Sequence, residues 1–162
     1  MAEVQVSLSK ALKLKNRLAG RVNSASNNVA SFNSVPKDQV GQVDVNAAWE
    51  LRKQITGALI KLKTILSEGA SPIRERLYTL QEMKSELSWV RGIGTTQGIQ
   101  HHGFRGLGET DVEYVAQFSK TDIDQVIRTL EISIDNLQDE IDDFNASTKV
   151  SLPQEILDLA SS

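Results

Sequence analysis

The stretch TDIDQVIRTLEISIDNLQDEIDDFN, residues 121–145, decides the fold class of this 162-residue chain. Its large apolar residues recur at alternating intervals of four and three, the pattern of a coiled-coil seam. The seam consists of Ile123, Ile127, Leu130, Ile134, Leu137, Ile141 and Phe144. The outer faces are acidic: Asp124, Glu131, Asp135, Asp139, Glu140, Asp142 and Asp143. We expect one long helix that buries its seam within the subunit or against a partner.

Three further helices are predicted upstream of this seam. Their apolar residues follow helical spacing over residues 7–30, 44–68 and 71–91, and residues 31–43 form a connector. Ser7 is the expected N-cap of the first helix, and Gly69 the expected C′ residue of the second. Gly57, inside the second helix, suggests close approach of a neighbouring helix. The two-residue break after Gly69 favours an antiparallel hairpin of helices.

A glycine-rich segment, residues 91–109, separates these helices from the last one. It begins RGIGTTQGIQHHGFRGLG and is too rich in glycine for a stable helix. Every second residue from Val112 to Phe118 is apolar, and most residues between them are polar, which predicts a short strand. Its natural partner is Gly98–Arg105. The tail, residues 149–162, reads as an extended turn and a short helix. The predicted fold is therefore all-α: one domain, residues 1–162, forming an antiparallel bundle of three to four long helices with a small β-hairpin before the last helix.

The glycine-rich segment also has the composition of an anion-binding cradle. Glycines expose backbone N–H groups, and cationic and polar side chains add donors. An aromatic side chain would provide a stacking platform for a base. The predicted ligand-binding residues are Arg91, Thr95, Thr96, Gln97, His101, His102, Phe104, Arg105 and Tyr114. The alternative is a loop that binds no ligand or only another subunit.

No enzyme signature is present in the sequence. The chain has no cysteine and only two histidines, His101 and His102, which disfavours a zinc site. There is no Gly-x-Ser-x-Gly elbow, and Gly92-Ile-Gly94 follows a predicted helix rather than a strand, unlike a dinucleotide-binding loop. We expect no catalytic residues, no metal and no cofactor. The N-terminus lacks a secretory pattern and no apolar run is long enough for a membrane span, so a cytoplasmic location is expected.

Charge is distributed unevenly along the chain. Residues 1–108 carry 15 Lys/Arg against 8 Asp/Glu, and residues 109–162 carry 3 against 13. The simplest interpretation is that the two halves pack against each other, within or between subunits. Lys10, Lys13, Arg17 and Arg21 form one stripe, either solvated or facing an anion at an oligomer centre. Nucleic-acid binding is disfavoured because the acidic half would repel phosphates.

The order of features resembles the septicolysin family, small helical proteins of bacteria and phages. The resemblance rests on Ser7-Leu-Ser-Lys-Ala-Leu12, Ser119-Lys-Thr-Asp-Ile123 and Leu137-Gln-Asp-Glu-Ile-Asp-Asp-Phe-Asn145, and covers about residues 7–150. It implies a helical bundle that oligomerises and has no established enzymatic activity.

Two functional hypotheses follow from the sequence. The first is a non-enzymatic homo-oligomer that binds and sequesters a small phosphate-bearing, nucleotide-derived ligand, by analogy with phage-encoded anti-defence proteins, which act in the host cytoplasm. The alternative is a structural or protein-interaction module that acts through its acidic coiled-coil helix.

Overall fold

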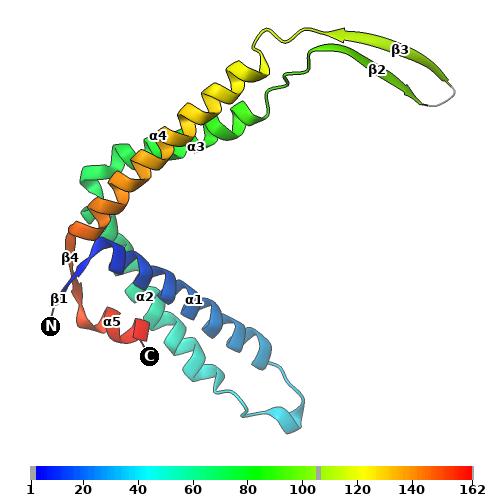
Figure 1. Ribbon diagram of the computed structural model, residues 1–162. Coiled ribbons are helices and arrows are strands. Elements are labelled where there is room, and N and C mark those ends of the chain that lie inside the picture. The colour runs from blue at the N-terminus through cyan, green and yellow to red at the C-terminus, as the bar shows by residue number, and fades with distance from the viewer. Residues whose placement is uncertain (1–2, 105–106, 162) are drawn as a thin grey trace. The chain divides into compact units, whose positions relative to one another are not determined.

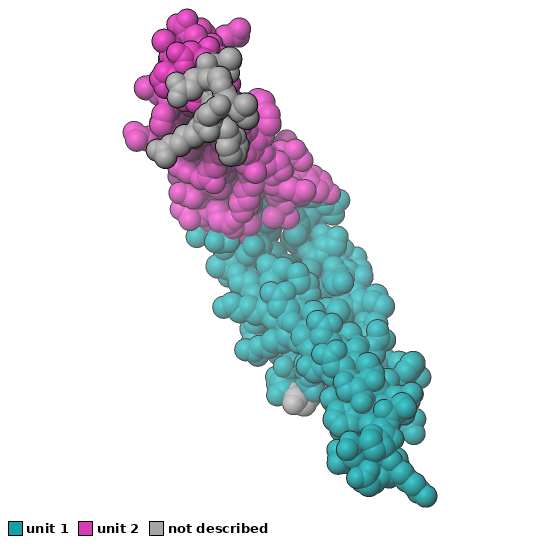
Figure 2. All heavy atoms as spheres, turned by 90° about the vertical axis from the view of Figure 1, so that its right-hand side faces the viewer, with its two compact units in different colours: residues 1–74, 142–162 teal, residues 75–141 magenta. Residues whose placement is uncertain are grey.

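The computed structural model describes residues 3–104 and 107–161 of the chain (Figure 1). It is mainly helical, which confirms the predicted mainly-α class. The elements are β1 (Glu3–Ser7), α1 (Leu8–Phe32), η1 (Lys37–Gln39), α2 (Val45–Gly69), η2 (Ser71–Ile73), α3 (Arg74–Arg91), β2 (Gly98–Phe104), β3 (Leu107–Tyr114), α4 (Lys120–Ser147), β4 (Lys149–Pro153) and α5 (Gln154–Ser161). They divide into unit 1, residues 1–74 and 142–162, and unit 2, residues 75–141 (Figure 2).

The two long helices of unit 1 begin at side-chain caps. Ser7 precedes α1 in an extended conformation, and its hydroxyl accepts a hydrogen bond of 3.2 Å from the Lys10 backbone N–H. Asp44 does the same for α2, accepting from the Ala47 N–H at 2.9 Å. Each cap satisfies one of the N–H groups that the first turn leaves without a partner. The predicted N-cap at Ser7 is confirmed.

The core of unit 1 lies where α1, α2, β4 and α5 meet. The buried residues of each long helix recur mostly every three or four residues, so they lie on one face, as the 3.6-residue period requires. The core residues are Val6, Leu8, Ala11, Leu14, Leu18, Ile55, Ala58, Leu62, Leu66, Val150, Leu152, Ile156 and Ala160. No polar or charged side chain is buried among the described residues, so this unit is held mainly by apolar packing.

The N-terminal strand β1 pairs with β4 near the other end of the chain. The pairing is antiparallel, with Val4 opposite Leu152 and Val6 opposite Val150 (Figure 1). Val6, Val150 and Leu152 are buried, while the residues between them face outward. This two-residue alternation places one side of the ribbon on the helices. The β1 strand was not predicted. The tail, predicted as an extended turn and a short helix, forms strand β4 followed by the short helix α5.

Both expectations for the glycines of α2 were wrong. Gly69 is the last residue of the helix, and Ala70 caps it with a φ of −85°, so no left-handed residue ends α2. A Cβ at Gly69 would instead lie 2.8 Å from Val150 Cγ1 and 2.9 Å from Leu8 Cδ2. A Cβ at Gly57 would have no described neighbour within 4 Å. Close packing therefore occurs at Gly69, and Gly57 lies on an exposed face.

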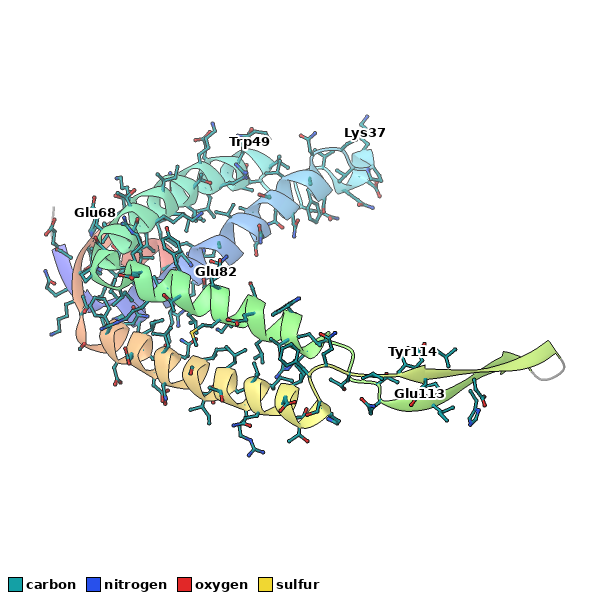
Figure 3. The ribbon with its side chains drawn as sticks, turned by 90° about the horizontal axis from the view of Figure 1, so that it is seen from above. Lys37, Trp49, Glu68, Glu82, Glu113 and Tyr114 are labelled. Carbon is teal, nitrogen blue, oxygen red and sulfur yellow. The ribbon has the colours of Figure 1, made fainter. Side chains whose placement is uncertain are left out.

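Unit 2 contains the antiparallel helices α3 and α4, which lie side by side (Figures 1 and 3). Three polar contacts join them at successive levels. Arg91 pairs with Glu131 at 2.6 Å, Lys84 donates to Gln138 at 3.3 Å, and Arg76 lies 3.6 Å from Glu140. Of the predicted seam on α4, Ile123, Ile134 and Ile141 are buried, whereas Ile127, Leu130, Leu137 and Phe144 are half-buried.

Strands β2 and β3 form an antiparallel ribbon between these helices in the chain. Gly98 lies opposite Tyr114, Gln100 opposite Val112 and His101 opposite Asp111, and the register shifts between His102 and Phe104. The predicted strand Val112–Phe118 was placed too late: β3 is Leu107–Tyr114. Because β2 begins at Gly98, opposite Tyr114, the alternation that continues to Phe118 has no partner strand.

Candidate functional site

The predicted cradle residues lie on three different elements of unit 2. Arg91 is in the last turn of α3, while Thr95, Thr96 and Gln97 lie on the connector to β2. His101 is in the middle of β2, and Tyr114 ends β3. His102 and Phe104 belong to β2 by their backbone, but their side chains are not described, and Arg105 lies outside the described residues.

Arg91 and His101, the described basic side chains of the cradle, already have carboxylate partners. The Arg91 guanidinium donates to Glu131 Oε1 at 2.6 Å, directed toward α4. His101 Nδ1 lies 2.5 Å from Asp111 Oδ1 on the opposite strand. All four side chains are largely exposed, so water screens both pairs and each contributes little to stability. An anion that bound either side chain would have to displace a carboxylate.

One part of the predicted site does come together, at the base of the ribbon. Gln97 Oε1 accepts a hydrogen bond of 2.9 Å from the Ala116 backbone N–H. One residue further along, Gly98 faces Tyr114 across the ribbon and has a φ of 87°, a conformation that favours glycine. This contact joins the connector before β2 to the one after β3. Gln97 therefore has a structural role in closing the ribbon.

The start of α4 is fixed by a reciprocal cap. The Ser119 N–H and hydroxyl both donate to Asp122 Oδ2, at 2.9 and 2.6 Å, and the Asp122 N–H donates back to Ser119 Oγ at 3.1 Å. These hydrogen bonds to the carboxylate lower the pKa of Asp122, the side-chain bond contributing most. Within the described part of the chain, no three His, Asp or Glu side chains gather to hold a metal ion.

The most unusual surface of unit 2 is apolar and was not identified from the sequence. Tyr78, Trp89 and Phe118 are exposed by 63%, 69% and 66%. Val115, Val126 and Ile132 are also exposed. Tyr78 and Trp89 are eleven residues apart, about three helical turns, so they share the outer face of α3. That spacing is the signal in the sequence, but two residues on one helical face do not show whether that face is buried or exposed.

An apolar groove forms part of this surface. Phe118, Val126 and Leu130 provide its apolar lining, and Glu86, Asp122, Gln125 and Thr129 complete it, with a volume of about 680 Å³. Trp89 is one turn beyond Glu86 on α3, which places it next to the groove. Arrangements of this kind, apolar residues rimmed by polar ones, commonly mark binding surfaces.

Unit 2 has little core of its own. Fifteen of the twenty buried hydrophobic residues among those described belong to unit 1 and five to unit 2, namely Leu80, Val90, Ile123, Ile134 and Ile141. None of the described side chains of the ribbon is buried, and no helix makes an extensive contact with β2 or β3 within the described residues. Many of the other large apolar side chains described in unit 2 are therefore exposed or half-buried.

Comparisons with other proteins give no assignment. No helix in the described part of the chain is both long and apolar enough to cross a membrane. No family model, curated protein or solved structure matches the chain. The resemblance to the septicolysin family stays a prediction, and functional inference rests on the geometry of unit 2.

Proposed function

We propose that the protein is a non-enzymatic homo-oligomer in which unit 2 of one copy is completed by unit 2 of another, forming a larger antiparallel helical bundle. The observation that supports this proposal is the exposed apolar surface around Trp89 and the groove lined by Phe118, Val126 and Leu130. Two helices with exposed apolar residues can bury these residues by packing against further helices. Unit 2 of a second copy would supply two such helices, α3 and α4.

The size of this surface fits an interface. Aromatic side chains bury roughly 150–250 Å² each when enclosed, so Tyr78, Trp89 and Phe118 together expose roughly 300–500 Å². Val115 and Val126 bring the total to roughly 400–600 Å². A stable interface buries about 800 Å² per partner, and this apolar area would be the larger part of it.

The two tryptophans of the chain provide a matched test. Trp89, on α3, is 69% exposed in unit 2, and Trp49, on α2, is 50% exposed in unit 1. Figure 3 labels Trp49. Light scattering coupled to size-exclusion chromatography should show an oligomer for the natural sequence. Trp89→Glu should weaken association about thirtyfold or more, the effect of losing a central aromatic residue. Trp49→Glu should leave the mass unchanged.

The outcome that contradicts this proposal is clear. A monomer over the accessible range of protein concentration, or equal loss of association in both tryptophan variants, would eliminate self-association through unit 2. Circular dichroism of each variant shows whether a change in mass reflects loss of helix. A protein that is monomeric alone but captures a different protein through the same face would favour the alternative hypothesis, an interaction module acting through α4.

The predicted ligand, a small phosphate-bearing nucleotide derivative, is the second part of the proposal. Oligomerisation would bring several copies of the connector with Thr95, Thr96 and Gln97 together and multiply weak donors. The Arg91–Glu131 pair makes a sharp test, because Glu131→Gln removes the carboxylate with which an anion would compete. Isothermal titration calorimetry with cyclic dinucleotides and ADP-ribose derivatives should show tighter binding to Glu131→Gln than to the natural sequence.

Arginine variants complete the ligand test. Arg91→Ala combined with Arg105→Ala should abolish binding if these cations hold the ligand. Binding that survives this double substitution, or no binding by any member of the panel, contradicts the ligand hypothesis. Neither result bears on the oligomer, which is measured separately by light scattering.

A further inference from the structure

We propose that the free edge of β2 pairs in antiparallel fashion with the β2 edge of a second copy, across a two-fold axis, to form a four-stranded sheet in the order β3–β2–β2–β3. This inference rests on the proposed oligomer and specifies one contact within it. Within the described residues, the β2–β3 ribbon has an unpaired edge along each strand, and no helix makes an extensive contact with either strand. Unpaired edges are templates for pairing with another chain.

The ribbon needs additional strands to be stable. An isolated two-stranded ribbon is at best marginally stable in water, whereas a sheet of more strands with an apolar face is stable. The face of the ribbon that carries Gln100, Val112 and Tyr114 has exposed apolar side chains at the last two positions. Two ribbons joined in one sheet would place this face next to its copy and enlarge the apolar surface that both can bury.

The two edges differ in charge, and this difference selects β2. Strand β2, GIQHHGF, contains no Asp, Glu, Lys, Arg or Pro, the residues that proteins use to block edge pairing. Strand β3, LGETDVEY, carries Glu109, Asp111 and Glu113 at alternate positions. Two β3 edges would bring like charges opposite each other, which destabilises pairing. The only ionisable residues of β2 are histidines, and His101 already faces a carboxylate of its own ribbon.

The difference in charge between the β2 and β3 edges also explains why the sheet would stop at two copies. Pairing of β2 with β2 leaves both β3 strands at the outer edges of the sheet. The carboxylates of Asp111 and Glu113 then face solvent at those edges (Figure 3 labels Glu113 on β3). Charged outer strands oppose addition of further strands. A symmetric contact between identical edges is therefore expected, rather than an open chain of ribbons.

Cysteine cross-linking tests the strand order directly, because the natural chain contains no cysteine. Directly opposed residues on adjacent antiparallel strands have Cα atoms about 4.5–5.5 Å apart, within the range a disulfide requires. The two outer strands of the four-stranded sheet lie about 14 Å apart, three strand spacings, which no disulfide spans. A single cysteine in β2 near the two-fold axis should therefore link two copies, and a single cysteine in β3 should not.

The variants form matched pairs across the ribbon. The β2 set is Ile99→Cys, Gln100→Cys and His101→Cys, and the β3 set at the opposed positions is Glu113→Cys, Val112→Cys and Asp111→Cys. Each full-length variant is oxidised mildly and analysed on a non-reducing gel. We expect a disulfide-linked dimer from at least one β2 variant and only monomer bands from the β3 set. Gln100→Lys should also weaken association up to about fivefold, by placing like charges at the paired edges.

Each result has a defined meaning. Cross-linking of a β3 variant, or preferential linking between Gln100→Cys and Val112→Cys copies when the two are mixed, overturns the proposed strand order. An oligomer by light scattering in which no β2 variant cross-links refutes the edge pairing and leaves the helical interface standing. A monomer by light scattering with no cross-link in any variant refutes both proposals together.

Discussion

Replacing Gly69 with alanine tests the closest packing in unit 1, where α1, α2 and β4 meet. The added methyl group would lie 2.8 Å from Val150 Cγ1 and 2.9 Å from Leu8 Cδ2. Both side chains are in the core, 9% and 1% exposed, so neither can move into solvent. Overpacking of this kind costs about 1–3 kcal/mol. Alanine is a better helix former than glycine, but at the last position of α2 this gain offsets only part of the cost. We expect the free energy of unfolding to fall by about 1–2 kcal/mol.

Gly57 in the same helix is the matched control, with the opposite expected sign. No described atom lies within 4 Å of the position its Cβ would occupy, and the residue is exposed. Alanine there adds no clash and restricts the unfolded chain. Gly57→Ala should therefore raise the free energy of unfolding by up to about 1 kcal/mol. The two substitutions have identical chemistry and differ only in their surroundings.

Urea unfolding followed by tryptophan fluorescence measures both effects. A Trp89→Phe background leaves Trp49, on α2, as the only tryptophan, so the signal reports on unit 1. A shift in the urea midpoint without a change in slope gives the difference in stability. Gly69→Ala as stable as the parent, or Gly57→Ala less stable than the parent, would refute the packing described here.

Three further predictions concern caps and core. Ser119→Ala removes the main hydrogen bond to the Asp122 carboxylate, so the pKa of Asp122 should return toward its ordinary 3.8, as measured by NMR titration. Because the folded pKa is lowered, the cap contributes stability above that ordinary value and loses it as pH falls through the folded pKa, so the two proteins should become alike in acid. Leu152→Ala, at a fully buried position of β4, should cost about 2–5 kcal/mol in urea unfolding. Arg21→Ala removes the donor to the Leu159 carbonyl in the last turn of α5 and should speed amide exchange in that helix.

The helices of this protein could be predicted because their signals are local. The N-cap Ser7 and the seam of α4 each depend on residues within a few turns of one another. Strand β1 could not be predicted in the same way. Its alternation covers only Val4 and Val6, and its partner β4 lies at the other end of the chain. A five-residue pattern is too short to identify so distant a partner.

For the candidate site, the sequence contains the residue types but not their contacts. The residue types of an anion cradle are present in residues 91–109, but the partner of each side chain could not be predicted. Arg91 pairs with Glu131, forty residues away, and Gln97 closes the ribbon by accepting from Ala116. Glu131 was read only as part of an acidic solvated face. The exposed aromatic surface could not be predicted, because helical spacing places Tyr78 and Trp89 on one face of α3 without showing whether that face is buried.

The salt dependence of association distinguishes the proposed interface from the charge-driven alternatives. Unit 2 has six Lys/Arg against twelve Asp/Glu, a net charge of −6, while unit 1 has twelve against nine, a net charge of +3. Two copies that associate through unit 2 repel each other, because both units carry net negative charge. The buried apolar area must outweigh this repulsion. Raising the salt concentration from about 0.1 M to 1 M shortens the screening length from about 10 Å to 3 Å, so it should strengthen this association.

Contacts between opposite charges respond in the other direction. If the acidic face of α4 met the positively charged unit 1 of another copy, or a basic protein, the same screening would weaken the complex. Sedimentation velocity at several salt concentrations measures the sign directly. Because the apolar and the electrostatic contributions predict opposite slopes, a complex that dissociates in high salt contradicts the interface through Trp89 and Phe118, whatever its stoichiometry.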